Sequence, residues 1–127
     1  MADADIGPHE IDYINAHGTS TPLGDIAEVS AVKDLFGDHA NSLAMSSTKS
    51  CTGHTLGAAG GLESIAVVKA ICDGVMPPTI NLDEPDEGFD LNFVANEPQE
   101  REINIALNNS FGFGGHNVSI AIAAFKD

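Results

Sequence analysis

Residues 56–72 read Leu-Gly-Ala-Ala-Gly-Gly-Leu-Glu-Ser-Ile-Ala-Val-Val-Lys-Ala-Ile-Cys, and their only polar members are Glu63, Ser64 and Lys69. A long run with so few polar side chains is typical of a helix that is apolar nearly all round, and such a helix is buried. We therefore predict a buried helix over residues 56–72. Residues 73–78 contain a glycine and two prolines, so the helix is expected to end there.

Two short strands and an amphipathic helix are predicted before this segment. Residues 10–15 and 43–48 have the alternation or the apolar content of strands. From residue 23 onward, apolar side chains recur at helical spacing, namely Ile26, Val29, Val32 and Phe36. Gly37 is placed to end that helix at residue 36.

The C-terminal part of the sequence predicts a loop followed by a hairpin. Residues 81–102 form an acidic stretch with one short strand around 91–94. Residues 103–108 and 118–125 have strand patterns and flank the glycine-rich segment 111–115, which indicates a β-hairpin. The predicted fold class is α/β, one layered unit over residues 1–127 whose sheet ends in an antiparallel pair.

Composition narrows the possible functions. The 127 residues carry 5 Lys plus Arg against 19 Asp plus Glu, a formal charge of -14. This balance argues against binding to nucleic acid or to an anionic membrane surface. Because no run of 18 apolar residues, no secretory signal and only two cysteines are present, we expect a soluble cytoplasmic protein without a disulfide framework.

Three histidines, His17, His54 and His116, each lie beside a glycine. For any one of them alone, the ordinary interpretation is a loop histidine bonded to a backbone carbonyl. His17 and His54, however, follow predicted strands and precede predicted helices, at the sheet edge where α/β proteins bind ligands. The sequence contains no Cys-x-x-Cys or His-x-x-x-His pair, so we predict no metal site.

His54 precedes the N-terminus of the predicted helix over residues 56–72. The positive end of a helix dipole lowers the pKa of a nearby imidazole and keeps it neutral. A neutral imidazole can donate a hydrogen bond to a carbonyl oxygen without titrating. We therefore predict that His54 is an electrophilic hydrogen-bond donor.

Lys49 and Glu63 both lie in stretches that otherwise have the pattern of buried segments. A lone buried charge is costly, so we predict that the two side chains form an ion pair. The sequence leaves open whether this pair is a structural salt bridge or part of a catalytic site.

The two cysteines are interpreted differently from each other. Cys51 lies between Lys49 and His54, where a thiolate would be activated, but it fits equally well as a small packing residue in a turn. Cys72, at the end of the predicted buried helix, is expected in the core. We do not predict Cys51 as a nucleophile.

Four segments together resemble the β-ketoacyl-[acyl carrier protein] synthases of fatty-acid synthesis, most closely the type II elongating enzyme. The segments lie in the family's order and cover residues 15–21, 47–61, 77–82 and 109–117. They read NAHGTST, STKSCTGHTLGAAGG, PPTINL and NSFGFGGHN.

The resemblance implies a thiolase-like fold of two similar α/β halves, a homodimer, and a decarboxylating Claisen condensation of malonyl-carrier protein with an acyl thioester. By matching motifs, His17 and His54 would hydrogen-bond the malonyl thioester oxygen. Lys49 would be the family's active-site lysine, held by Glu63.

The remaining matches concern the substrate arm and the oxyanion. Thr19 and Thr21 would line the entrance for the phosphopantetheine arm that the substrates carry, and no other cofactor is implied. Phe113, with Phe111 beside it, would gate the acyl pocket and lend its backbone N–H to the oxyanion hole.

The departures from the family are as informative as the matches. The family's nucleophilic cysteine lies in its N-terminal half, and no motif here matches it or the first strand-helix unit of the C-terminal half. We therefore expect a partial domain, inactive alone, whose partners are the N-terminal ketosynthase half and acyl carrier protein. The alternative is an incomplete fragment or a non-enzymatic partner similar to a chain-length factor.

Overall fold

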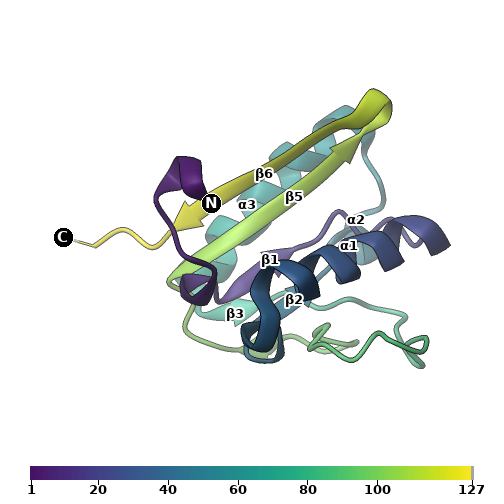
Figure 1. Cartoon of the computed structure of the whole chain (residues 1–127), viewed down its shortest axis with the longest axis horizontal. Helices are drawn as coiled ribbons and strands as arrows, with labels where there is room; N and C mark the ends of the chain where they lie inside the picture. Colours follow the sequence, from purple (N-terminus) through teal and green to yellow (C-terminus); the bar gives the residue numbers. More distant parts are fainter. Residues whose placement is uncertain (127) are drawn as a thin grey trace.

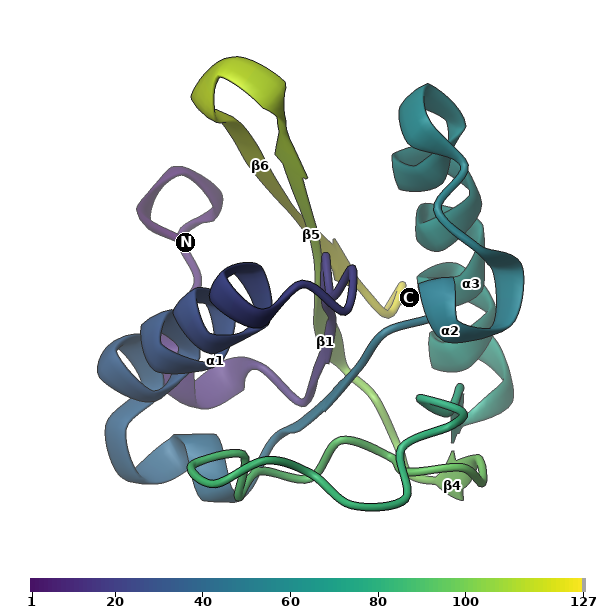
Figure 2. The same ribbon diagram turned by 90° about the vertical axis from the view of Figure 1, so that its right-hand side faces the viewer.

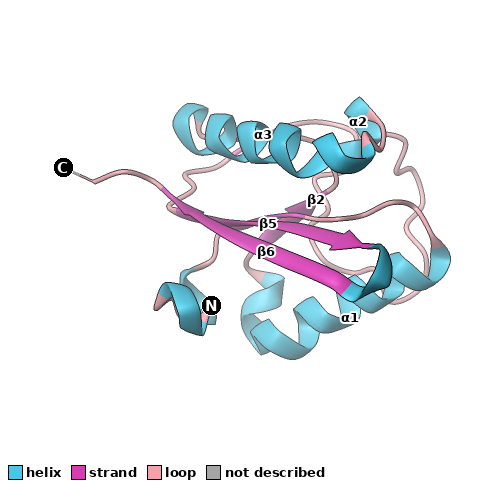
Figure 3. Ribbon diagram, turned by 90° about the horizontal axis from the view of Figure 1, so that it is seen from above, coloured by secondary structure: helices cyan, strands magenta, loops and turns pink. Residues whose placement is uncertain are grey.

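A mixed four-stranded sheet forms the middle layer of the computed structural model, which describes residues 1–126 (Figure 3). The strand order is β2-β1-β5-β6, with bounds Ala44–Ser46, Tyr13–Asn15, Ile105–Gly112 and His116–Ala123. β1 pairs in parallel with β2 and β5, and β6 is antiparallel to β5. The predicted α/β class and the antiparallel pair at the end of the sheet are confirmed.

Helices cover both faces of this sheet (Figure 2). α3 (Ala59–Asp73) and the short α2 (Lys49–Thr52) lie on one face, and α1 (Pro22–Phe36) lies on the other. Short 3-10 turns occupy Ala2–Ala4, Pro8–Glu10, Gly37–Asn41, Leu56–Ala58 and Phe113–Gly115. β1 begins at Tyr13, three residues later than the strand predicted over residues 10–15, and Glu10 belongs to the turn at Pro8–Glu10.

α1 begins and ends almost where the sequence indicates, with Pro22 in its first turn and Gly37 at its C-cap with φ 54°. Val29, Val32 and Phe36 pack in one cluster with residues of the sheet. Ile26, predicted on the same stripe, is instead 55% exposed. The buried stripe of α1 includes Glu28 in its place.

α3 departs from the prediction of a helix that is buried all round. Its buried stripe consists of Ala59, Glu63, Val67 and Ala70. The opposite face exposes large apolar side chains, with Leu62 at 46%, Ile65 at 63% and Val68 at 45%. Cys72, expected in the core, is exposed as well. The physical reason is that, among residues 1–126, α3 contacts the sheet with one face only.

The segment after α3 contains less regular structure. β3 (Val75–Met76) pairs with β4 (Gln99–Glu100) in a separate two-stranded sheet. The strand predicted around residues 91–94 is wrong, because that stretch makes only single bridges, Ala44↔Asn92 and, one residue further on, Thr79↔Ala95.

The two strands of the β5–β6 hairpin lie closer to the turn than predicted, and the hairpin extends to one end of the molecule (Figure 1). Phe111 and Gly112 belong to β5, so the turn contains only Phe113–Gly115. Gly114 and Gly115 have φ angles of 76° and 80°, a region that glycine enters without a steric penalty. Among residues 1–126, no helix is both long and apolar enough to cross a membrane.

Candidate active site

The loop that carries His17 leaves β1 and leads into α1. The backbone N–H groups of His17 and Gly18 donate to the two carboxylate oxygens of Glu28, each at 3.0 Å. Gly18 has a φ of 35°, and a Cβ added there would lie 2.7 Å from the Cβ of Ser47. Because only glycine fits this close approach, the loop packs directly against the segment after β2.

Three aromatic rings from different segments meet beside this loop. The ring of His17 lies edge-on to that of His54, with centroids 5.6 Å apart. The ring of Phe111, on β5, is 5.4 Å from His17. The two histidines predicted at the sheet edge are therefore brought together, with Phe111 against one of them.

The electrostatic environment keeps His17 neutral. Burial lowers the pKa of the His17 imidazole, and the neighbouring Lys49 and His54 lower it further, while Asp25 acts in the opposite direction. Nδ1 of His17 is buried and has no hydrogen-bond partner among residues 1–126. An imidazole whose surroundings favour its neutral form is thus found at His17. The same property stays a prediction for His54.

His54 is exposed, and one hydrogen bond defines its tautomer. Its Nδ1 accepts the backbone N–H of Leu56 at 3.2 Å. Because a backbone N–H can only donate, Nδ1 carries no proton and the neutral ring carries its proton on Nε2. Leu56 has a φ of 53°, which is uncommon for a residue other than glycine. The Nε2–H of His54 is thus available as a donor. α3 begins at Ala59, so His54 lies further from the N-terminus of this helix than the sequence predicted.

Lys49 and Glu63 form a buried ion pair, as predicted. Their side chains are 5% and 3% exposed. Glu63 belongs to the sheet-facing stripe of α3, while Lys49 is the first residue of α2. The Oε2 atom of Glu63 has no hydrogen-bond partner among residues 1–126.

The residues matched to the substrate arm and the oxyanion hole are more exposed than Lys49 and Glu63. The hydroxyls of Thr19 and Thr21 are hydrogen-bonded to each other at 3.1 Å. Phe113, in the hairpin turn, is 95% exposed, whereas Phe111 is 37% exposed and contacts His17. The structure therefore joins Phe111 to the histidines but leaves the ring of Phe113 in solvent.

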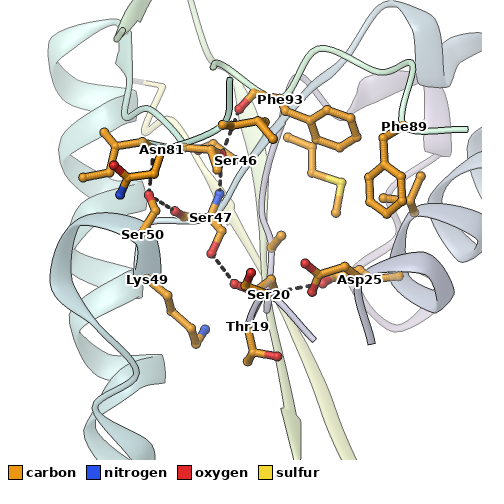
Figure 4. Close-up of a pocket in the computed structure, with 18 of the residues that line it drawn as sticks. Thr19, Ser20, Asp25, Ser46, Ser47, Lys49, Ser50, Asn81, Phe89 and Phe93 are labelled. Carbon is orange, nitrogen blue, oxygen red and sulfur yellow. Dashed lines mark hydrogen bonds between the residues drawn. The ribbon is translucent and has the colours of Figure 1, made fainter. Parts of the chain in front are cut away.

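A cavity of about 360 Å³ adjoins these groups (Figure 4). Thr19, Lys49 and His54 contribute to its lining, and Phe89 and Phe93 form an apolar part. Figure 4 shows that Lys49 and Phe89 lie on opposite sides of this space. The cavity thus joins polar groups beside the histidines to an apolar wall.

The cysteines do not join the histidines in a metal cluster. Cys51 is exposed, and its Sγ lies 3.8 Å from the carbonyl oxygen of Pro78. His116 is exposed at the start of β6. Within residues 1–126, no group of three His, Cys, Asp or Glu side chains is placed to hold a metal ion.

Glu28 is a candidate site residue that was not predicted from the sequence. It is 4% exposed and accepts the side-chain amide of Asn109 at 3.1 Å in addition to the two loop N–H groups. The sequence spacing could have identified it, because Glu28, Val32 and Phe36 follow one another at i, i+4 spacing and so lie on one face of the helix. A carboxylate on an apolar stripe must be hydrogen-bonded or paired, which marks it as a candidate.

The sequence of the chain matches a known protein family. Residues 1–83 match the family model described as beta-ketoacyl synthase, C-terminal domain. The chain belongs to the β-ketoacyl synthase family. The predicted resemblance is confirmed.

Similar sequences carry names from fatty-acid synthesis. The chain is 57% identical over 127 residues to 3-oxoacyl-[acyl-carrier-protein] synthase 2 of Coxiella burnetii. It is 50% identical over 126 residues to the chloroplastic 3-oxoacyl-[acyl-carrier-protein] synthase I of Hordeum vulgare. These matches cover 100% and 99% of the chain but only 31% and 27% of the relatives, so the chain spans less than a third of their length.

Solved structures place the fold in the same family. A ketosynthase of a type II polyketide synthase, solved with its acyl carrier protein and a hexaketide, superposes with a TM-score of 0.95 at 39% identity. A β-ketoacyl synthase from Burkholderia phymatum superposes with a TM-score of 0.91 at 36% identity. Each covers 98% of this chain, which itself covers 31% and 30% of those chains. The fold is that of the C-terminal part of a thiolase-like ketosynthase.

Proposed function

We propose that these residues form the C-terminal catalytic segment of a 3-oxoacyl-[acyl-carrier-protein] synthase. The proposed reaction is the decarboxylating Claisen condensation of malonyl-carrier protein with an acyl thioester. The observation that carries the proposal is the meeting of the His17 and His54 rings, 5.6 Å apart, beside the buried Lys49–Glu63 pair.

The histidines suit the enolate step of this reaction. Loss of carbon dioxide leaves the electron pair of the broken C–C bond on the malonyl fragment, as an enolate with its charge on the thioester oxygen. His54 has its Nε2–H free to donate to that oxygen. His17 supplies the second donor and stays neutral because its pKa is lowered, so it stabilises the enolate without protonating it.

Lys49 contributes through its charge. It is held in place by Glu63, and its positive charge opposes protonation of His17. The proposed role of the pair is therefore to keep His17 a neutral donor at physiological pH. This role distinguishes a catalytic ion pair from one that only stabilises the fold.

The acyl-carrying cysteine is proposed to come from outside these residues. Cys51 lies on α2 with its Sγ against the carbonyl oxygen of Pro78, in a solvent-exposed position. The enolate carbon would attack the acyl thioester on the external cysteine, forming the new C–C bond and releasing the thiolate. We propose that residues 1–127 alone do not catalyse condensation.

The substrate arm and partners follow from the same assignment. Thr19 and Thr21 are proposed to contact the phosphopantetheine arm, and the backbone N–H of Phe113 to bind the oxyanion. Acyl carrier protein is the proposed partner, supported by the related ketosynthase that was solved with its carrier protein. A homodimer of the whole enzyme, working in the cytoplasm, completes the proposal.

A chimera tests the assignment. Residues 1–127 would replace the matching 127 residues of the Coxiella burnetii relative. The chimera is expected to condense malonyl-carrier protein with an acyl substrate, and the variants His17→Ala and His54→Ala to lose about a hundredfold or more in rate. His9→Ala, an exposed histidine outside the site, is the matched control and should leave the rate unchanged. Full activity without His17 and His54 would instead favour a non-enzymatic partner similar to a chain-length factor.

A further inference from the structure

Two neighbouring asparagines in β5, Asn108 and Asn109, are buried, with exposures of 1% and 9%. Successive side chains of a strand point to opposite faces of its sheet. In the register, Asn108 lies beside Asn15 of β1, and Asn109 lies beside Ser119 of β6. The two amides therefore face the two different helical layers.

Asn108 faces the layer that contains α3. Its Nδ2 donates to the carbonyl oxygen of Gly60 at 3.2 Å and to Oγ of Ser64 at 3.0 Å. Its Oδ1 accepts Nδ2 of Asn15 at 3.0 Å. Oδ1 of Asn15 in turn accepts the hydroxyl of Thr48 at 3.1 Å and its backbone N–H at 3.4 Å. This chain of contacts joins the helix that carries Glu63 to the residue before Lys49.

Asn109 faces the layer that contains α1. Its Nδ2 donates to Oε1 of Glu28 at 3.1 Å, and its Oδ1 accepts the hydroxyl of Ser119 at 2.8 Å. Glu28 is the carboxylate that accepts the N–H groups of His17 and Gly18. This second chain of contacts joins the hairpin to the loop that carries His17.

The orientation of every amide in these chains is fixed by its partners. A carboxylate and a carbonyl oxygen can only accept, so Nδ2 of Asn109 must face Glu28 and Nδ2 of Asn108 must face Gly60. The N–H of Thr48 can only donate, so Oδ1 of Asn15 must face it. No alternative flip satisfies the same groups, which makes each asparagine specific to its position.

We propose that Asn108 and Asn109 are positioning residues that act from opposite faces of β5, one on the His17 loop and the other on the Lys49–Glu63 pair. Asn109 fixes the His17 loop through Glu28. Asn108 fixes α3 and the residue before Lys49, and so the Lys49–Glu63 pair. The catalytic purpose of this positioning rests on the proposed function, while the contacts themselves do not.

Amide hydrogen exchange on the 127-residue chain tests the positioning directly. Asn109→Ala is expected to speed exchange at His17 and Gly18 by about tenfold or more, because it removes a hydrogen bond to the carboxylate that binds both amides. Exchange at Thr48 and Ser64 should not change. Asn108→Ala should give the reverse pattern, so each variant is the control for the other.

A general loss of stability would speed exchange at both sets of amides together. Equal effects of the two variants on both sets would therefore overturn the proposal. If either alanine variant fails to fold, Ser119→Ala and Ser64→Ala remove one partner of Asn109 and Asn108, respectively, and leave both asparagines in place. The same reciprocal pattern, with smaller changes in exchange rate, is expected from this milder pair.

The chimera with the Coxiella burnetii relative gives the catalytic readout. Asn109→Ala and Asn108→Ala are each expected to lower kcat by about tenfold with little change in KM. Asn109 acts on the loop of His17, which is proposed to stabilise the enolate, and Asn108 acts on the ion pair that is proposed to keep His17 neutral. Reciprocal exchange with an unchanged kcat would overturn the positioning role and leave the proposed function intact. Failure of the unsubstituted chimera to condense would count against the proposed function. The exchange pattern would still decide whether Asn109 positions the His17 loop and Asn108 positions α3 and Thr48.

Discussion

The His17 loop and the hairpin turn at Phe113 are both matched to catalytic roles, yet the structure holds them very differently. The loop is fixed by two hydrogen bonds to buried Glu28 and by the close approach of Gly18 to Ser47. The turn consists of Phe113, Gly114 and Gly115, and its one large side chain is 95% exposed. The difference indicates that residues 1–126 hold the histidine side of the candidate site, which we call its fixed half, but do not hold the turn at Phe113, which we call its open half.

Removing one partner of the Lys49–Glu63 pair should have the largest effect. Lys49→Met leaves the carboxylate of Glu63 buried and uncompensated, so the free energy of unfolding should fall by about 3–5 kcal/mol. Urea denaturation measures this free energy. Lys69→Met is the control, because Lys69 forms an exposed ion pair with Asp73 on α3, the helix that also carries Glu63. The double variant Lys49→Met with Glu63→Gln should recover part of the loss. If Lys49→Met lowered the free energy of unfolding no more than Lys69→Met does, the buried pair would contribute little to the stability of the fixed half of the site.

Glu28→Ala should be the next most damaging change. It leaves the N–H groups of His17 and Gly18 and the amide of Asn109 without their acceptor, so we expect a loss of about 2–3 kcal/mol in unfolding free energy. Asp34→Ala, an exposed carboxylate on the same helix, is the matched control. If both variants unfolded at the same urea concentration, the contrast between loop and turn would lose its main support.

Several parts of the fold were predictable because their signals are local. The spacing of Val29, Val32 and Phe36 predicts α1, and the flanking strand patterns around the glycine-rich turn predict the hairpin. The pairing of Lys49 with Glu63 followed from the cost of burying either charge alone. The meeting of His17 and His54 followed from their positions at the same edge of the sheet.

Other features depend on contacts that no local pattern contains. The roles of Asn108 and Asn109 arise from the strand register, which places Asn15 and Ser119 beside them. The apolar pattern of α3 predicts burial, but it cannot say which neighbouring layer covers each face. For that reason the exposure of Ile65 and Cys72 was not foreseen.

The lowered pKa of His17 gives a pH-dependent prediction of moderate size. The folded state holds His17 neutral, so its pKa lies below that of the unfolded chain, about 6.5. The neutral ring therefore contributes stability that is present above this pH and is lost as the pH falls toward the folded-state pKa. Urea unfolding at pH 7.5 and pH 5.5 should show a larger loss for the wild type than for His17→Asn. An equal loss would mean that the burial of His17 does not favour its neutral form.

Phe113→Ala should have the smallest effect on stability and thereby separates the two regions most clearly. Because the Phe113 ring is almost fully exposed, its removal should change the unfolding free energy by no more than about 0.5 kcal/mol. Phe111→Ala, which removes the ring that contacts His17, should cost about 1 kcal/mol. In the chimera, by contrast, Phe113→Ala should alter the rate of acyl transfer, since there the ring is proposed to gate an acyl pocket. A large stability loss from Phe113→Ala in the 127-residue chain would show that the turn is held by these residues after all, and the distinction between a fixed half and an open half of the site would no longer stand.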